Sequence, residues 1–291
     1  MVHEHEKCLI SGVCNLRPMK GYESNYLVRS HPTGFVFCSK IPTEAELSSY
    51  YSQYSRNDEI SEVTIKSYHS LLDEFEKYRK YGQILDIGCG TGLFLKEAKK
   101  RGWTVFGTEF TPEAIAKCVE KGIETRSGKL QADWWSEGYF DIITSFEVIE
   151  HINNPLEETD LMFRYLRSGG LLFVTTPNFN SLERYFIGPR HNTIITYPEH
   201  LSYYSRKTLT FLMLRIGFKK EKVLTTGISI SNIKNWIRKT NEPYLGPSSV
   251  DEQVRMAIDS SRIAKVAKNT VNFFLNLLGL GNSLKGWFVK P

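Results

Sequence analysis

Three glycines stand out as residues whose spacing points to chemistry. The stretch QILDIGCGTGLFL (83–95) places Gly88, Gly90 and Gly92 directly behind an apolar run that predicts a buried strand. A glycine-rich turn between a strand and a helix lets the backbone approach a bound nucleotide closely. The spacing is G-x-G-x-G, whereas dinucleotide-binding folds use G-x-G-x-x-G. The turn therefore predicts a nucleotide site and disfavours a dinucleotide.

Two carboxylates accompany this turn. Asp86 lies inside the apolar strand, where a buried carboxylate needs a cationic or hydrogen-bond-donating partner, such as the ammonium group of a ligand. Glu109 ends the next expected strand, 21 positions after Gly88, where an acid accepts hydrogen bonds from the ribose hydroxyls of an adenosine. NAD and S-adenosylmethionine both contain an adenosine, so these residues alone leave both open.

The elements that must position these residues alternate in type from Gln83 onwards. Strands are expected over 83–88, 103–109, 123–127, 140–145, 171–176 and near 218–225, with a last strand in SLKGWFVKP. Helices are expected over 92–101, 112–121, 155–167 and 206–216. This alternation predicts a parallel, doubly wound sheet with helices on both faces. Ligands of such sheets bind at the carboxyl ends of the strands, where the glycine turn and Glu109 fall.

Four motifs occur in order along this alternation. They are LDIGCGTG (85–92), GTE (107–109), YFDIITSFEVIEHINNP (139–155) and LRSGGLLFVTTPN (166–178). With these motifs the sequence resembles the class I S-adenosylmethionine-dependent methyltransferases over roughly 82–225 and again at the final strand. The resemblance implies an α/β fold with a Rossmann-like, seven-stranded, doubly wound sheet, and S-adenosylmethionine as the cofactor.

The resemblance also implies roles for individual residues. Those expected against the methionine part of the cofactor are Asp86, Gly88, Cys89, Gly90 and Gly92. Those expected against the ribose and adenine are Glu109, Phe110, Lys129 and Leu130, although many relatives carry an acid in the 128–131 loop. Phe146 and Glu147 are expected beside the methyl group that is transferred.

An oxygen nucleophile must lose a proton as it attacks the methyl group, which favours a histidine base with a pKa near neutrality. His200 lies in YPEHLSYYS, on the loop where class I enzymes build the acceptor pocket, and a similar stretch occurs in relatives that methylate sugars and quinone precursors. It is the expected base, unless it caps the following helix or binds the acceptor passively. His151 is either catalytic or a structural partner of Glu150.

Tyr197, Tyr203 and Tyr204 are candidates for a wall of aromatic rings that stacks against the acceptor. No metal site of paired acids is expected.

The first 42 residues resemble the small zinc ribbon that heads many sugar and natural-product methyltransferases. The four positions of its zinc ligands are occupied by Cys8, Ser11, Ser30 and Thr33. Zinc is therefore not expected, because three of the four thiolates are absent. We expect a metal-free hairpin stabilised by Tyr26, Leu27, Phe35 and Phe37.

Two further segments follow the hairpin in the expected domain organisation. Residues 43–81 are expected to form a helical lid over the cofactor, and 82–291 the methyltransferase domain. Within that domain, an amphipathic and partly basic insertion around 227–280 is expected to pack against the core or a partner subunit rather than a membrane surface.

Composition restricts the function further. The 291 residues are 41% hydrophobic and 24% charged, as in an ordinary globular protein. The net charge of +5 comes from dispersed basic residues, which argues against a nucleic-acid partner and suits a phosphate-bearing substrate. Neither a membrane span nor the apolar core of a signal peptide is recognised, and the number of cysteines is odd, so a cytoplasmic location with reduced thiols is expected.

We therefore expect an S-adenosylmethionine-dependent methyltransferase that acts on a small-molecule acceptor. The acceptor is expected to be a sugar, either nucleotide-linked or part of a polysaccharide or natural product. A quinone precursor or other small aromatic is the alternative acceptor. A non-catalytic scaffold that binds the cofactor is the alternative function, and assembly into a homo-oligomer is also open.

Overall fold

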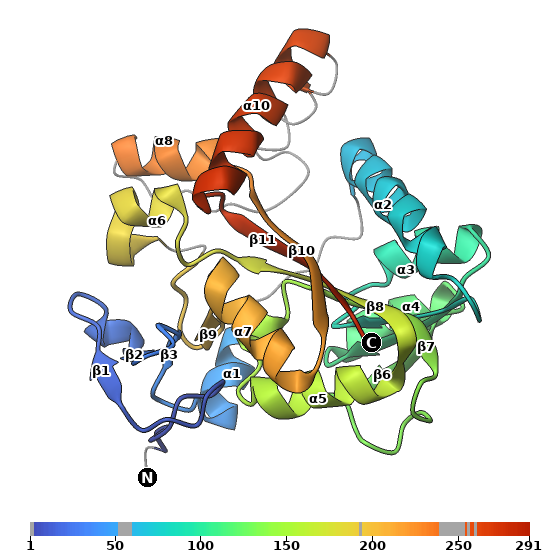
Figure 1. Ribbon diagram of the computed structural model, residues 1–291, viewed down its shortest axis with the longest axis horizontal. Coiled ribbons are helices and arrows are strands. Elements are labelled where there is room, and N and C mark those ends of the chain that lie inside the picture. Colours follow the sequence, from blue (N-terminus) through green and yellow to red (C-terminus); the bar gives the residue numbers. More distant parts are fainter. Residues whose placement is uncertain (1–2, 52–59, 192–193, 239–253, 255–256, 259–260) are drawn as a thin grey trace.

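A seven-stranded sheet forms the centre of the molecule in the computed structural model (Figure 1). The structure describes residues 3–51, 60–191, 194–238, 254, 257–258 and 261–291. In spatial order the strands are β10 (Lys219–Thr226), β11 (Ser283–Val289), β8 (Leu166–Pro177), β7 (Phe140–Phe146), β4 (Gln83–Ile87), β5 (Thr104–Glu109) and β6 (Glu124–Ser127). The five from β8 to β6 are parallel, and β11 is antiparallel to both β8 and β10. The expected sheet is confirmed.

Helices cover both faces of this sheet because successive strand residues point to opposite sides. Leu85 and Ile143 face a core cluster with side chains from α5 and α7, whereas Ile84 and Ile142 face a cluster with side chains from α2, α3 and α4. The helices are α1 (Glu44–Tyr51), α2 (Glu62–Phe75), α3 (Leu93–Lys100), α4 (Pro112–Glu120), α5 (Pro155–Tyr165), α6 (Leu182–Ile187), α7 (Arg206–Ile216), α8 (Ile230–Arg238) and α10 (Arg262–Leu278). Short 3-10 helices are η1 (Glu23–Asn25), η2 (Glu76–Tyr78), η3 (Ile149–His151) and η4 (Gly188–Arg190).

The boundary between α5 and β8 differs from the sequence-based expectation. A helix was expected to continue to residue 167, but α5 ends at Tyr165 and β8 begins at Leu166. Leu166 is fully buried and pairs with Phe140 of β7, so a tertiary contact decides its conformation. The two glycines that follow at 169 and 170 also favour the end of a helix.

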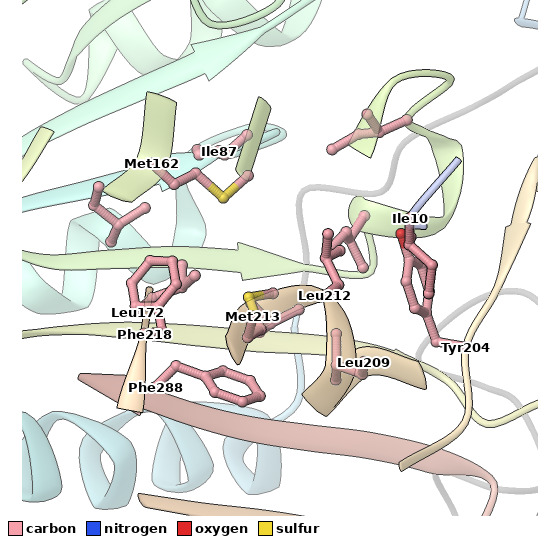
Figure 2. Close-up of a cluster of buried hydrophobic side chains, with 14 of the residues drawn as sticks. Ile10, Ile87, Met162, Leu172, Tyr204, Leu209, Leu212, Met213, Phe218 and Phe288 are labelled. Carbon is pink, nitrogen blue, oxygen red and sulfur yellow. The ribbon is translucent and has the colours of Figure 1, made fainter. Parts of the chain in front are cut away.

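A second, four-stranded sheet joins the first residues of the chain to a distant loop. Its order is β1 (Leu16–Pro18), β2 (Leu27–Ser30), β3 (Val36–Cys38) and β9 (Ser202–Tyr203), and β9 comes from the loop after β8. Ile10 of the first segment packs in the same cluster as Tyr204 and Leu209, as Figure 2 shows. This N-terminal sheet is therefore attached to the core of the larger one.

The positions that correspond to zinc ligands lie in two similar turns. The Gly12 amide donates to the Cys8 carbonyl over 2.8 Å, and the Gly34 amide donates to the Ser30 carbonyl over 2.9 Å. The Cys8 thiol lies 3.9 Å from the Thr33 hydroxyl, so the two turns meet. The resemblance to a zinc ribbon stays a prediction.

Side chains expected to stabilise the hairpin behave in two ways. Leu27, Phe35 and Phe37 are buried, as expected. Tyr26, in contrast, is 39% exposed and lies edge-on to Tyr197 with ring centroids 5.0 Å apart. It therefore stabilises the contact between the hairpin and the loop before β9 rather than the hairpin core.

Helix α10 extends away from the sheet (Figure 1). Of its residues Leu275 alone is buried, whereas Ile263 is 84% exposed and Phe273 63%. Of the two expected partners of the 227–280 insertion, the core is wrong for most of this helix, because its apolar side chains form one face that lies exposed. Packing on a partner subunit stays a prediction. Across the described ranges, no helix is both long enough and apolar enough to cross a membrane.

Candidate active site

The glycine turn between β4 and α3 is tightly enclosed. Gly88, Gly90 and Gly92 have φ angles of 66°, 55° and 75°, in the left-handed region that glycine adopts without strain. A Cβ at Gly88 would lie 2.6 Å from the Val148 side chain, and one at Gly92 would lie 2.5 Å from Ile123. The turn therefore has room only for glycine at these two positions, and its backbone is left as the surface that a ligand meets.

Glu109 connects the glycine turn to the start of α4. This side chain is 2% exposed at the end of β5. Its Oε2 accepts a hydrogen bond from the Gly90 amide over 2.9 Å, and its Oε1 accepts from the Phe110 and Thr111 amides over 2.8 and 3.0 Å. These bonds fix the carboxylate at the carboxyl end of the sheet. Phe110 itself is 70% exposed, as a residue that covers a ligand would be.

Asp86 lies deeper, on β4, and is 3% exposed. Its Oδ1 accepts a hydrogen bond from the Thr144 hydroxyl over 2.7 Å. Burial raises the pKa of Asp86 to about 8, the Thr144 bond lowers it, and the Cys118 and Glu109 charges raise it further. A positively charged ligand group beside Asp86 would favour its ionised form.

Phe146 and Glu147 follow the end of β7. Phe146 contacts Phe94 of α3 and Tyr68 of α2, with ring centroids 4.9 and 6.2 Å apart, so α2 lies beside this end of the sheet. Glu147 is exposed and has a φ of 52°, a strained conformation for a residue with a side chain. Its amide donates to the Thr175 carbonyl over 3.1 Å. Such strain is common at functional sites.

The loop after β6 contains the two residues expected at the adenine edge. Leu130 is 2% exposed and belongs to the core cluster beneath α5, whereas Lys129 is exposed. Burial raises the pKa of Glu158 to about 7, and the nearby Lys129 charge opposes this rise. Lys129 is thus the side chain of this pair that faces outwards, and its contact with adenine stays a prediction.

His151 and His200 come together although they are 49 residues apart. Their rings meet edge to face with centroids 4.9 Å apart. The Nδ1 atom of His200 lies 2.8 Å from the Ile194 carbonyl, and that of His151 lies 2.9 Å from the Glu199 carbonyl. Because a carbonyl only accepts, both Nδ1 atoms donate, which leaves the lone pair of each neutral ring on Nε2. Burial lowers the pKa of His200 to about 4, and the neighbouring His151 lowers it further.

Glu150 completes this group. It is 2% exposed, and neither of its carboxylate oxygens has a hydrogen-bond partner among the described residues. Its Oε1 lies 3.9 Å from Nε2 of His151. Burial raises the pKa of Glu150 well above its usual range, and the charge of Glu147 raises it further. Atoms of Glu150, His151 and His200 that can bind a metal all lie within 4.8 Å of one another.

The N-terminal sheet holds the His200 loop in place. The Leu201 amide donates to the Glu150 carbonyl over 2.8 Å, which docks the loop on η3. On the other side, the Cys38 amide donates to the Leu201 carbonyl over 2.9 Å, and the Cys38 thiol donates to the His200 carbonyl over 3.4 Å. The first segment of the chain therefore positions a residue of the candidate active site.

Sequence reasoning identified His151 and His200 but did not predict the three-residue cluster. The sequence suggested Glu150 and His151 as a structural pair and did not indicate a group of metal ligands. His200 joins this pair only because the distant loop docks beside it. His191, also on that loop, lies outside this cluster, with its Nε2 3.4 Å from Glu183.

Two of the tyrosines expected to form a stacking wall for the acceptor are placed differently. Tyr203 and Tyr204 are buried in the core, 4% and 0% exposed, because both pack against aromatic side chains.

Solved structures share this fold. An S-adenosylmethionine-dependent methyltransferase from Archaeoglobus fulgidus matches 85% of this chain and 100% of its own, with a TM-score of 0.53 and 18% identity. A sarcosine dimethylglycine methyltransferase, so named by inference, from Galdieria sulphuraria matches 78% of this chain and 85% of its own, with a TM-score of 0.52 and 16% identity. The chain therefore has the fold of the S-adenosylmethionine-dependent methyltransferases.

Comparison of sequences narrows this class to a family. Residues 59–223, more than half of the chain, match the family described as Methyltransferase domain, and the chain belongs to that family. The ubiquinone biosynthesis O-methyltransferase of Pseudomonas fluorescens (strain SBW25) is 31% identical over 105 residues, which are 34% of this chain and 45% of that protein. The matched part thus spans less than half the length of such curated relatives.

The residues present fit S-adenosylmethionine, the cofactor of this class. A buried carboxylate of raised pKa, Asp86, suits the ammonium group of the methionine part. The Glu109 carboxylate, held at the end of β5 by the Gly90, Phe110 and Thr111 amides, suits the ribose hydroxyls. The glycine turn leaves only backbone between them.

Proposed function

We propose that this chain transfers the methyl group of S-adenosylmethionine to a hydroxyl oxygen of a sugar. The observation that supports this most strongly is the placement of Asp86 and Glu109. Both carboxylates are almost fully buried at the same end of neighbouring parallel strands, with the glycine turn between them. Burying two acids there costs solvation free energy, and a positively charged nucleoside derivative bound between them would offset that cost.

When bound, the cofactor supplies an electrophilic methyl group on its sulfonium. The protein has to align an oxygen with that group and keep water out. In this proposal Asp86 binds the ammonium group, Glu109 binds the ribose, and Phe110 covers the adenine. Phe146 and Glu147 lie beside the methyl group, at the end of β7.

The acceptor oxygen is proposed to lie near His151 and His200. The lone pair on Nε2 of His200 is oriented away from the Ile194 carbonyl and suits a base or a ligand. A histidine whose pKa is about 4 is, however, a weaker base than the near-neutral histidine that the sequence led us to expect. The role of His200 as the base stays a prediction.

A phenolic hydroxyl of a quinone precursor is the second candidate acceptor. It is favoured by the names of the curated relatives, ubiquinone biosynthesis O-methyltransferases, which match about a third of this chain. The sugar is supported by the resemblance of the first 42 residues to the ribbon of sugar methyltransferases, and the contact between the turns at Cys8 and Thr33 is compatible with that resemblance. The acceptor is in either case a small molecule with a hydroxyl group.

Isothermal titration calorimetry with S-adenosylmethionine tests the cofactor part. The parent chain should bind one equivalent, and Asp86→Ala and Glu109→Ala should each weaken binding at least about tenfold, because each removes a charged hydrogen-bond acceptor. Glu120→Ala, an exposed acid on α4, is the matched control and should bind normally. Absence of binding to the parent chain would refute the proposal.

Turnover of candidate acceptors tests the methyl-transfer activity and the identity of the acceptor. Sugar nucleotides, free glycosides and catechols are incubated with the cofactor, and S-adenosylhomocysteine is quantified. Methylation of a sugar supports the proposal, and methylation of only the catechols supports the second candidate. Tight cofactor binding without turnover of any hydroxyl compound would favour a non-catalytic scaffold.

A further inference from the structure

We propose that Glu150, His151 and His200 form a site for one divalent metal ion of the first transition row. Its chemical type is that of a catalytic ion with two imidazoles and one carboxylate as ligands. In addition, and resting on the function proposed above, the ion holds the hydroxyl oxygen of the acceptor.

The first observation is the burial of the Glu150 carboxylate, whose neighbours are the Thr176 hydroxyl and the Glu147 carboxyl. It is 98% buried, and neither oxygen has a hydrogen-bond partner in the described part of the chain. Burying a carboxylate without a partner is costly, so such groups are normally paired or bind a cation. The neighbouring Glu147 adds a second negative charge beside it. A cation is the partner that suits both groups.

The second observation is the orientation of the two imidazoles. Backbone carbonyls of Ile194 and Glu199 accept hydrogen bonds from Nδ1 of His200 and His151. Each ring therefore presents its Nε2 lone pair, the form that binds a metal. Metal-binding histidines commonly have their other ring nitrogen fixed in this way.

The third observation is the spacing. The candidate ligand atoms lie within 4.8 Å of one another, and Oε1 of Glu150 is 3.9 Å from Nε2 of His151. Ligand atoms around an ion with bonds of about 2.1 Å are about 3 to 3.5 Å apart, so the cluster needs only small side-chain rotations to close on an ion. Two histidines and one carboxylate leave further coordination positions open, as in catalytic metal sites.

The place of the cluster connects it to methyl transfer. Val148, two residues before Glu150, is the side chain that a Cβ at Gly88 would meet at 2.6 Å. The segment that carries Glu150 and His151 therefore packs directly on the glycine turn. An acceptor oxygen bound to the ion would lie at the same end of the sheet as the cofactor.

The ion would activate the hydroxyl group of the acceptor for methyl transfer. The ion lowers the pKa of the bound hydroxyl, and its proton passes to water. The oxygen lone pair forms the new O–CH₃ bond while the S–CH₃ bond breaks and its electrons return to sulfur. The products are a methyl ether, neutral S-adenosylhomocysteine and one proton. No oxidant or reductant is needed.

Metal binding is tested on the full chain without cofactor or acceptor. After treatment with a chelator and its removal, MnCl₂ is titrated and bound ion is measured by electron paramagnetic resonance and calorimetry. Mn²⁺ is used because it binds free thiols weakly, which reduces interference from the cysteines. The parent chain should bind one equivalent, and Glu150→Gln and His200→Ala should each bind at least about tenfold more weakly.

His31→Ala, an exposed histidine of the N-terminal segment, is the matched control and should bind like the parent chain. Circular dichroism melting verifies that each variant is folded, and the isosteric Glu150→Gln keeps the packing of the site. Absence of a single-equivalent site in the parent chain would overturn the proposal. Equal binding by the parent chain and both folded variants would also overturn it.

The role in methyl transfer has a separate readout. If an acceptor is found, removal of metal should lower kcat at least about 100-fold with S-adenosylmethionine affinity unchanged, and Mn²⁺ or Zn²⁺ should restore it. Turnover that is insensitive to removal of bound metal would overturn this role. The first titration needs no turnover, so a failure of the metal site and a failure of the proposed function give different results.

Discussion

In the proposed site, Asp86 would couple the charge state of the protein to binding of the cofactor. Folding raises the pKa of this carboxyl from 3.8 to about 8, so the folded chain without cofactor binds the proton more tightly than the unfolded chain does. This contribution to stability is present below pH about 4 and is lost as the pH rises towards 8. A bound ammonium group favours the ionised form, so it displaces the proton.

The affinity for S-adenosylmethionine should therefore rise with pH between about 6 and 7.5, below the pH at which the ammonium group itself loses a proton. Calorimetry in buffers of different ionisation enthalpy should detect release of a proton on binding. Asp86→Asn should bind more weakly and without this pH dependence. An affinity of the parent chain that does not change over this range would contradict the argument.

Gly88 is a residue of the glycine turn at which a single added methyl group should damage the site. Gly88→Ala adds a Cβ in a left-handed conformation and places it 2.6 Å from Val148, whose loop must then move. We expect a loss of about 1–3 kcal/mol in the free energy of unfolding and at least about tenfold weaker cofactor binding. Chemical denaturation and calorimetry measure the two effects.

Gly12→Ala provides the comparison for Gly88→Ala. Its φ is 75°, but no atom lies within 4 Å of the added Cβ. The Gly12→Ala variant has a similar backbone strain, but it causes no steric conflict and lies outside the glycine turn. If both variants bound the cofactor equally well, close packing at Gly88 would not be what shapes the turn.

At the level of elements, the last turns of α10 hold it to the larger sheet in the part of the chain that the structure describes. Leu275 is 6% exposed, and Asn276 accepts a hydrogen bond from the Thr225 amide over 3.0 Å. Leu275→Ala should therefore cost about 2–3 kcal/mol in the free energy of unfolding, because it leaves a cavity. Phe273→Ala, two residues earlier and 63% exposed, should change it by less than about 0.5 kcal/mol.

Denaturant titrations of the two variants check this pair. An equal loss in both would mean that Phe273 is covered in solution, by another copy of the chain or another partner. The result therefore also shows whether another protein surface covers the exposed side chains of α10. The amphipathic pattern predicted a helix here correctly, but the sequence does not contain the information on what covers it.

At the scale of the whole molecule, the N-terminal sheet and the larger sheet share one core. Ile10, Phe35 and Phe37 pack in the same cluster as Tyr204 and Leu209 of the distant loop and α7. Neither part can lose its structure without exposing apolar side chains of the other. We expect a single cooperative transition in differential scanning calorimetry, with equal calorimetric and van't Hoff enthalpies.

Two resolved transitions would contradict this expectation and would mean that the N-terminal segment unfolds on its own. The control is Tyr204→Ala. It removes a fully buried ring from the junction of the two parts, so it should lower the Tm and broaden or split the transition. The same variant should disturb His200, four residues away on the same loop.

Most of the larger sheet follows from local sequence. Apolar runs between glycine turns and helical repeats predict β4, β5 and β7 and the helices between them, because burial on both faces requires that pattern. The same signals place Asp86, Gly88 and Glu109 at one end of the sheet, since the carboxyl ends of parallel strands share an edge. The sequence by itself therefore determined that the residues proposed to bind the cofactor come together.

Only the tertiary structure determined the part of the candidate site that contains Glu150, His151 and His200. Glu150 and His151 are 50 and 49 positions from His200, and β9 of the same loop pairs with β3 of the N-terminal segment. No local pattern encodes such pairings, because they depend on which surfaces meet after the sheet has formed. The buried carboxylate and the two oriented imidazoles therefore became visible as one cluster only in the folded chain.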